Sequence, residues 1–569
     1  MTTNDPTPPA AAAPDPGSGT VHGIAEAVYR RRWWTLAVLC LSLLIVFVGN
    51  SSLNVAIPTL SRELEATESQ LQWVIAVYSL VFAGLLFTTG ALGDRFGRKG
   101  ALQLGLLVFL AACVAATFAD QMWQLIAARG AMGLGAALIM PSTLSILVNV
   151  FPPHERTKAI AIWASVTGAA GAIGPVASGW VLDHFWYGAV FLINVPFVTT
   201  ALVAGVVLVP RSRDPEHGVL DPPGAVLSII GLASLVYGLI EAPERGWLDP
   251  FTLVWFAVAA VAIALFVWWE LRVEEPMLDI RFFRNRAFSS GTAGMMLVFL
   301  AMYGSMFLMT QYIQIILGYG PLDTSLRLLP MAPIMIIVAP LTPRLSARFG
   351  ANRTVAVGMV LIATGFLILR TLTVDSSVVV VMVSLVPMTC GMALAMSPMT
   401  AAIMSAVPAR RAGAGSAMND ATRELGAALG IAVMGSIAAS QYGSAVEGLV
   451  GGLPAELATR AEASISGALQ VAAGLPGDAS EALRTGAEAA FMDGIHFAVV
   501  AGTIIALIAS VVVYRFMPKQ VAHEGAMHGA AESMEDAAEL GLAGVPPVFP
   551  DEEFPGDDDR RVVPDPTGA

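Results

Sequence analysis

Two acidic residues, Asp420 and Glu424, lie four positions apart at the start of the penultimate apolar segment of this sequence. The apolar run that follows them, residues 425–439, has 15 residues, whereas a membrane-spanning helix needs about 20. A span here must therefore draw both carboxyl groups toward hydrocarbon on one helix face. Such a pair is suited to taking up and releasing protons. The alternative is a solvated interfacial pair near Arg411 and Arg423.

A third charged residue, Arg129, lies inside an apolar segment and is followed by Gly130, Gly133 and Gly135. An arginine at the centre of a membrane span costs about 2.5–3.5 kcal/mol on insertion scales, so it needs a cavity, a partner or the interface. We expect a partner or a cavity, which makes Arg129 a candidate for proton coupling beside the two acids. The alternative is that Arg129 extends along the helix to the outer membrane surface.

Residues 90–100 read GALGDRFGRKG and lie between two long apolar runs. Glycine permits a tight reversal of the chain, and basic residues of membrane proteins are retained on the cytoplasmic side. A generic basic loop would explain the bases but not the aspartate set between two glycines. We therefore predict a cytoplasmic gate made of Gly90, Asp94, Arg95, Gly97, Arg98 and Lys99.

Composition places most of the chain in lipid. It has 569 residues, of which 56% are hydrophobic and 13% are charged, and its mean hydropathy is +0.70; soluble domains carry about 25% charged residues. The net charge of −12 comes largely from the end of the chain, since residues 519–569 hold twelve acids and three bases. Cys40, Cys113 and Cys390 lie in apolar runs with no metal-ligand spacing, so we expect no metal, no cofactor and no disulfide framework.

The apolar segments predict an all-α, polytopic membrane protein with fourteen transmembrane helices. The predicted spans are 34–57, 71–92, 101–119, 123–148, 159–182, 188–209, 224–241, 251–269, 288–317, 326–347, 353–371, 378–404, 416–440 and 492–515. With both termini in the cytoplasm, the inner loops hold twenty-one basic residues and the outer loops six. This bias fits the positive-inside rule and requires an even number of helices.

The spans divide the chain into five predicted parts. These are a disordered cytoplasmic N-terminus (1–29), a six-helix bundle (30–210), a linker with two extra helices (211–286), a second six-helix bundle with an extracellular loop at 441–491 (287–516), and a disordered acidic tail (517–569). A faint repeat supports paired bundles, because LGDRFG at 92–97 and LSARFG at 345–350 agree at four of six positions. Transporters built from paired repeats bind substrate between the halves.

These features resemble the major facilitator superfamily of transporters. The turn at 90–100 is similar to the family's loop between helices 2 and 3, and Arg129 with its glycines is similar to the fourth-helix motif, although Met132 replaces the customary glutamine. In the family this arginine lines the cavity and is implicated in proton coupling. Residues 49–58 resemble the first-helix pattern of the fourteen-helix drug:proton antiporters typified by QacA and EmrB, but Gly49 stands at the position of their aspartate.

The fifth predicted span resembles the signature helix of proton-coupled exporters within this superfamily. The matching residues are Gly171, Gly174, Pro175 and Gly179, and Ser178 stands where a second glycine is usual. Ala76 occupies a second-helix position at which QacA-like proteins carry an acid. With Gly49 and Ala76 both neutral, the resemblance leaves Asp420 and Glu424 as the acids that could carry protons.

Uncharged polar and soft side chains supply candidates for a substrate cavity. We expect it to include Asn50, Asn54, Gln311, Gln314 and Met306. Flexible methionines suit a promiscuous pocket, although helix packing and helix–helix hydrogen bonds would explain the same residues.

The resemblance implies a proton-coupled efflux antiporter that exports hydrophobic or cationic drug-like compounds by alternating access. We expect a monomer in the bacterial cytoplasmic membrane, with protons and lipid as partners and no nucleic acid. The sequence displays no catalytic constellation, so an enzyme is not expected. Two alternatives stay open: a lipid or metabolite exporter with altered proton coupling, and a membrane sensor or scaffold that acts through the 441–491 loop and the tail.

Overall fold

The structure is a computed structural model that describes residues 20–21, 24–212, 221–274, 276–407 and 412–519. The first half begins with two short antiparallel strands, β1 (Thr20–Val21) and β2 (Ile24–Ala25). Its helices are α1 (Glu26–Glu63), α2 (Glu68–Phe96), α3 (Arg98–Thr117), α4 (Met122–Val150), α5 (Pro153–His184), α6 (Ala189–Leu192) and α7 (Asn194–Leu208).

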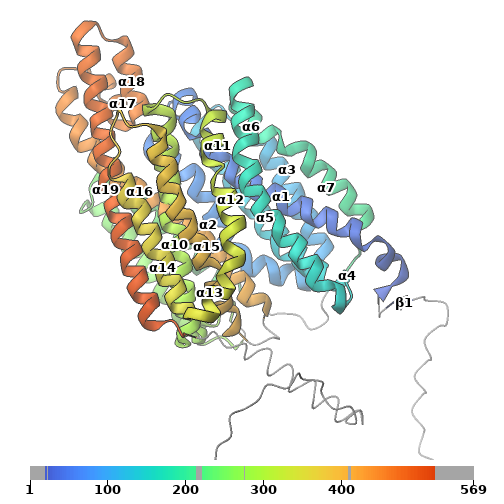
Figure 1. The fold of residues 1–569 in the computed structure, drawn as a ribbon. Coiled ribbons are helices and arrows are strands. Elements are labelled where there is room, and N and C mark those ends of the chain that lie inside the picture. The colour runs from blue at the N-terminus through green and yellow to red at the C-terminus, as the bar shows by residue number, and fades with distance from the viewer. Residues whose placement is uncertain (1–19, 22–23, 213–220, 275, 408–411, 520–569) are drawn as a thin grey trace, which may run out of the picture. The chain divides into compact units, whose positions relative to one another are not determined.

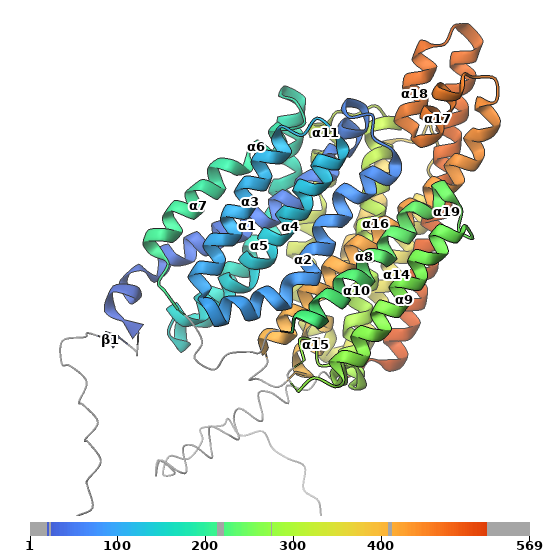
Figure 2. The same cartoon turned by 180° about the vertical axis from the view of Figure 1, so that it is seen from behind.

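An inserted pair of helices, α8 (Pro222–Arg245) and α9 (Pro250–Glu270), is followed by the short helix η1 (Ile280–Arg284). The second half consists of α10 (Arg286–Gln311), η2 (Tyr312–Ile316), α11 (Pro321–Leu328), α12 (Met331–Val338), η3 (Ala339–Leu341), α13 (Thr342–Phe349), α14 (Ala351–Leu369), α15 (Val378–Ser405), α16 (Ala412–Val450), α17 (Ala455–Ala463), α18 (Ile465–Gly474) and α19 (Gly477–Phe516). The ribbons are drawn in Figure 1 and, from behind, in Figure 2.

Thirteen helical segments in the described part of the chain are long and apolar enough to cross a membrane. The 32-residue helix α5 lies where the fifth span is predicted, and with it the long segments number fourteen. The all-α membrane fold is thereby confirmed. One predicted span is broken: prolines 330, 333, 340 and 343 divide it into α11, α12, η3 and α13, because proline removes a backbone donor and clashes with the preceding turn.

Two segments outside the predicted membrane spans are helical. The first helix begins at Glu26, inside the region expected to be disordered, and Arg32 near its start pairs with Glu155 of α5 at 2.7 Å. The predicted outward loop at 441–491 is a helical cap: α16 continues to Val450, α17 and α18 follow, and α19 begins at Gly477. This cap stands at one end of the helices in both views (Figures 1 and 2). Residues 1–19 and 22–23 of the predicted N-terminus and residues 520–569 of the predicted acidic tail lie outside the described residues.

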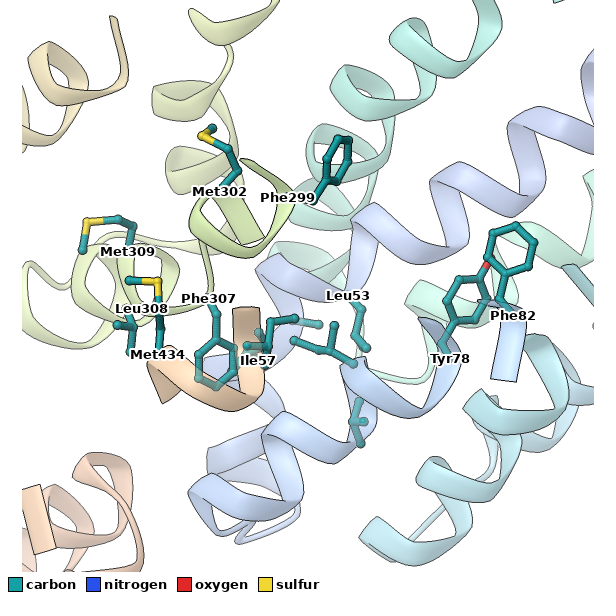
Figure 3. Packing of buried hydrophobic residues seen from close by; sticks show 14 of the residues in the cluster. Leu53, Ile57, Tyr78, Phe82, Phe299, Met302, Phe307, Leu308, Met309 and Met434 are labelled. Carbon is teal, nitrogen blue, oxygen red and sulfur yellow. The ribbon is translucent and has the colours of Figure 1, made fainter. Parts of the chain in front are cut away.

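The helices pack as two groups that meet along two seams. In the first half α1 packs on α5 and α2 on α4, and in the second half α10 packs on α16 and α14 on α15 and α19. Between the halves α2 lies against α16 and α5 against α11, while α8 touches both α2 and α16. Buried side chains from α1, α2, α10 and α16 form one hydrophobic cluster at this junction, including Leu53, Tyr78, Phe307 and Met434 (Figure 3).

The repeat at 92–97 and 345–350 has a counterpart in the backbone. Gly97 and Gly350 both end a helix with positive φ, +116° and +92°, a conformation that glycine adopts readily. The next residue in each half binds the chain just after that half's last helix. The Arg98 amide donates to the Ser212 carbonyl at 3.0 Å, and the Ala351 amide donates to the Lys519 carbonyl at 2.8 Å. The two halves therefore share a local structure as well as a short sequence.

Candidate functional site

Arg129 is fully buried and binds two neighbouring helices. Its Nε donates to the Val74 carbonyl at 3.1 Å, its Nη1 to the Gly49 carbonyl at 3.1 Å, and its Nη2 to Asn50 Oδ1 at 3.2 Å. The guanidinium also lies 4.4 Å from the centre of the Tyr78 ring, within the range of a cation–π interaction. Because its exposed fraction is 0%, Arg129 does not extend to the membrane surface, and that alternative is wrong.

The glycines after Arg129 explain how it comes so close to its acceptors. A Cβ at Gly133 would meet the Tyr78 carbonyl at 2.5 Å, and one at Gly135 would meet the Gly105 carbonyl at 2.9 Å. Small residues let helix backbones approach closely. The spacing of Arg129, Gly133 and Gly135 therefore packs α4 against α2 and α3, which sets the guanidinium among the backbone carbonyls of α1 and α2.

The two predicted acids have different environments. Glu424 on α16 is 9% exposed, and its Oε2 accepts a hydrogen bond of 2.5 Å from Ser79 Oγ on α2. It also lies within electrostatic range of Tyr78 and Arg129. Asp420, one turn earlier, is instead 3.7 Å from Arg423 of its own helix. The structure thus brings Glu424, rather than the pair as a unit, to the buried arginine of the other half.

Arg129, Tyr78, Ser79 and Glu424 form what we call the central polar cluster. Among the described residues, Arg129 makes no ion pair within 4.0 Å, so its charge is met by carbonyl dipoles, an amide oxygen and an aromatic ring. A buried charge held in this way is sensitive to any nearby change of charge. Protonation of Glu424 is such a change, and it would occur at the contact between the halves.

The two positions at which the resemblance implies acids, 49 and 76, do not face this cluster. A Cβ at Gly49 would meet Phe109 Cζ at 3.0 Å and Met132 Cε at 3.7 Å, so a side chain there would enter the packed interior of the first half. Ala76 is fully buried among apolar residues of α8 and α16. Packing at both positions favours small side chains, which is a physical reason for the departures seen in the sequence.

Four of the five residues predicted for the substrate cavity contact other residues of the protein. Asn50 binds Arg129, Gln311 Nε2 donates to Glu68 Oε1 at 3.0 Å, and Gln314 Nε2 donates to the Val55 carbonyl at 2.9 Å. The two glutamines therefore join α10 and η2 to the first half. In the described part of the chain, Asn54 Oδ1 and Gln314 Oε1 are buried without a hydrogen-bond partner. Met306 packs partly buried against the hydrophobic cluster.

The fifth-helix motif makes contacts on two sides. Towards α1, Ser52 Oγ donates to the Gly174 carbonyl at 3.2 Å, and Ser178 Oγ donates to the Ser52 carbonyl at 2.8 Å. Towards the second half, Ser325 Oγ of α11 donates to the Pro175 carbonyl at 2.7 Å, and a Cβ at Gly179 would meet Leu322 Cα at 2.7 Å. Serine in place of a glycine at 178 thus adds a hydrogen bond, whereas Gly179 is needed for the close approach of α5 and α11.

The predicted gate turn is held within the first half. Arg98 Nε lies 2.6 Å from Asp94 Oδ1, one helical turn apart, and Lys99 Nζ donates to the Val206 carbonyl at 2.7 Å. Gly90 lies against α4, where a Cβ at this position would meet Pro141 Cβ at 3.5 Å. Arg95 stacks beside Phe96, with its guanidinium carbon 5.5 Å from the ring centre. The gate role of this turn stays a prediction.

Comparison with known proteins assigns the family. Residues 39–431 match the model of the Major Facilitator Superfamily. The chain belongs to this superfamily. Among its relatives are the multidrug efflux pump LfrA of Mycolicibacterium smegmatis, 37% identical over 85% of this chain and 96% of the relative, and the tetracenomycin C resistance and export protein of Streptomyces glaucescens, 33% identical over 88% and 94%. The methyl viologen resistance protein SmvA of Salmonella typhimurium is 34% identical over 81% and 93%.

Solved structures support the same major facilitator fold. A bacterial homologue of the lysosomal transporter Spinster aligns with a TM-score of 0.59 at 16% identity, covering 86% of this chain and 98% of that one. A peptide transporter bound to sulfate aligns with a TM-score of 0.55 at 15% identity, covering 85% and 96%. At these identities the likeness concerns the fold alone.

Three residues of this major facilitator chain were missed by the sequence reasoning. Ser79 and Tyr78 lie in an apolar helix, where neither a serine nor a tyrosine predicts its partner, which is Glu424 of the second half for Ser79 and Arg129 for Tyr78. Glu68 lies in the first turn of α2 after the N-cap Thr67, which accepts from the Gln70 amide, so it looks like an ordinary residue near a helix end. Its contact with Gln311 across the halves has no local signal in the sequence.

Proposed function

We propose that this protein is a proton-coupled antiporter that exports hydrophobic, cationic drug-like compounds by alternating access. The hydrogen bond between Ser79 and Glu424 is the single observation that carries the proposal. It joins the two halves through a titratable group, beside the buried charge of Arg129. The family assignment and the efflux pumps among the relatives support the transport class.

In this proposal the charge of Glu424 couples protons to the movement of the halves. Ionised Glu424 accepts the Ser79 hydrogen bond and attracts a cation that enters from the cytoplasm or the inner leaflet. A proton taken up from outside neutralises the carboxylate, removes its attraction for the cation and weakens the contact between α2 and α16. Release of that proton inside restores the contact and resets the cycle.

The proton gradient supplies enough free energy to make or break the contact between Ser79 and Glu424. One pH unit supplies about 1.4 kcal/mol per proton, and 100 mV adds about 2.3 kcal/mol per charge moved. A hydrogen bond to a charged group contributes about 1.5–3 kcal/mol. One proton at Glu424 is therefore matched in energy to making or breaking the Ser79 contact.

The remaining assignments belong to the same proposal. The inner loops carry most of the bases, which favours both termini in the cytoplasm of a bacterium. Asp94 and Arg98 would then lie at the cytoplasmic gate, and the helical cap would face outward. The cycle needs no bound cofactor or metal, no nucleic acid and no second copy of the chain.

Dye efflux from cells tests this function. Cells that express the protein are loaded with ethidium, and the efflux rate is measured with and without a protonophore. We expect faster efflux than in control cells and loss of that gain when the protonophore collapses the gradient. Efflux that persists unchanged with the protonophore would contradict proton coupling, and no gain in efflux for any hydrophobic cation would contradict the export function.

A further inference from the structure

A cavity of about 470 Å³ lies where α2 and α8 meet the helical cap. Its walls come from α2, α8, α16, α17, α18 and α19, so it lies at the seam between the two halves. It does not contain Glu424, Ser79 or Arg129. Its volume is within the roughly 300–1,000 Å³ that small-molecule sites occupy.

The lining of this cavity has one sign of charge. Glu68, Glu244, Glu447 and Glu462 line it, and among the described residues no lysine, arginine or histidine does. The two arginines nearest in sequence are paired with acids that do not line the cavity: Arg245 with Glu241 at 3.2 Å and Arg460 with Glu65 at 2.6 Å. A cleft with one sign of charge and low-dielectric walls concentrates ions of the opposite sign.

Aromatic and buried polar groups add features of a binding site. Tyr442 and Phe491 line the cavity and are each 5% exposed. The Tyr442 hydroxyl already donates to the Ala461 carbonyl at 2.9 Å, so what the residue offers a ligand is its ring. Gln72, 1% exposed, also lines the cavity, and its amide nitrogen donates no hydrogen bond to a described residue. Aromatic rings beside carboxylates suit a cation with an apolar body.

The cavity is linked to the contact between the halves. Glu68 in its wall accepts the hydrogen bond from Gln311 of α10 at 3.0 Å, and Glu65, just before α2, pairs with Arg460 of the cap. A cation beside Glu68 would compete with Gln311 for the carboxylate. Occupation of the cavity would therefore weaken one of the bonds that hold the first half against the second.

We propose that this cavity is a second binding site for organic cations, distinct from the central polar cluster and formed with the helical cap. Its ligand class is a monovalent organic cation with an apolar or aromatic body. That the ligand is the exported compound rests on the proposed function; that the cavity binds such cations does not. The helical cap thus acts as part of a ligand site as well as a cover.

Binding to the purified full-length protein in lipid nanodiscs tests the proposal. Ethidium is the cationic probe, N-phenyl-1-naphthylamine the uncharged one, and both are titrated without any gradient in the Glu424→Gln background, which removes the central carboxylate. Glu447→Gln with Glu462→Gln changes two lining residues. The matched control, Glu456→Gln with Glu481→Gln, removes the same charge from exposed positions of the cap outside the cavity.

We expect the lining pair to weaken ethidium binding at least about fivefold and the control pair less than about twofold, with binding of the uncharged probe unchanged. An equal loss in both pairs, an equal loss for both probes, or no loss in the lining pair would each overturn the proposal. The test is separate from that of the proposed function, because binding is read without a gradient whereas proton coupling is read by efflux in the protein with Glu424 intact.

Discussion

Ser79 of α2 and Glu424 of α16 are joined by a hydrogen bond of 2.5 Å between the serine Oγ and the glutamate Oε2. These residues are 345 positions apart in the chain and belong to the two halves of the transporter. Ser79 follows Tyr78, whose ring centre lies 4.4 Å from the guanidinium of Arg129. Among the described residues, that guanidinium is held by carbonyls and an amide rather than by an acid. A proton at Glu424 would therefore alter both the contact between the halves and the field around a buried cation.

Ser79→Ala should slow export by about tenfold or more, because a hydrogen bond to a charged acceptor contributes about 1.5–3 kcal/mol. Ser79→Thr keeps the hydroxyl and should retain most of the rate. The rates are measured in proteoliposomes at a fixed pH difference. Ser228→Ala is the control, since the Ser228 hydroxyl donates to Ala225 of its own helix. Equal rates for Ser79→Ala and the unchanged protein would argue against a role for this contact.

Arg129→Lys should lower export at least about tenfold although it keeps the charge. The single ammonium group of a lysine cannot make the three hydrogen bonds that the Arg129 guanidinium donates to Val74, Gly49 and Asn50 on two helices,. Arg129→Met should lower export as much yet stay folded, because loss of a buried charge offsets part of the loss of hydrogen bonds. Transport and thermal melting are measured together. Full export by the lysine variant would show that charge alone suffices.

Gly179→Ala should lower the melting temperature and export, whereas Gly171→Ala should leave both unchanged. A Cβ at Gly179 would meet Leu322 Cα at 2.7 Å and the Pro321 carbonyl at 2.8 Å, while one at Gly171 would meet no described atom within 4 Å. Overpacking of this kind costs about 1–3 kcal/mol, and it would push α5 away from α11. If the two variants behave alike, the close approach of α5 and α11 is not the reason for a glycine at 179.

Gly97→Ala should destabilise the turn between α2 and α3 by about 1–3 kcal/mol, because its φ of +116° is strained for any residue with a Cβ,. Gly100→Ala is the control, since a Cβ there would meet no atom of the described residues within 4 Å. Melting of the purified variants in detergent measures both. A melting temperature for Gly97→Ala equal to that of Gly100→Ala would contradict the requirement for glycine at 97.

The sequence predicted the helices well because each membrane span is a long run of apolar residues, and because basic residues are concentrated in the loops on the cytoplasmic side. It also predicted that Arg129 and Glu424 leave solvent, and the structure buries both side chains; their role in proton coupling stays a prediction. The sequence places the helical cap outside the membrane because α17 and α18 have 9 and 10 residues, too few to span the membrane. The tenth span was predicted as one helix at 326–347, whereas the structure divides it at its prolines.

Partners across the two halves were beyond the sequence for a physical reason. The bonds from Ser79 to Glu424, Gln311 to Glu68 and Gln314 to Val55 join residues more than 240 positions apart. No local periodicity records which side chain another helix will meet. The same limit applies to Asn50: its amide oxygen accepts from Arg129, a partner that its polarity alone did not predict, and its contact with substrate stays a prediction.

The most direct test of the account compares two transport modes of Glu424→Gln in proteoliposomes. Counterflow of a labelled cation needs no gradient, whereas accumulation driven by an imposed pH difference needs a group that carries the proton. We predict that Glu424→Gln retains counterflow within about threefold but loses accumulation, while Glu456→Gln keeps both. Accumulation by Glu424→Gln at the rate of the unchanged protein would contradict the claim that this carboxyl group couples protons to export.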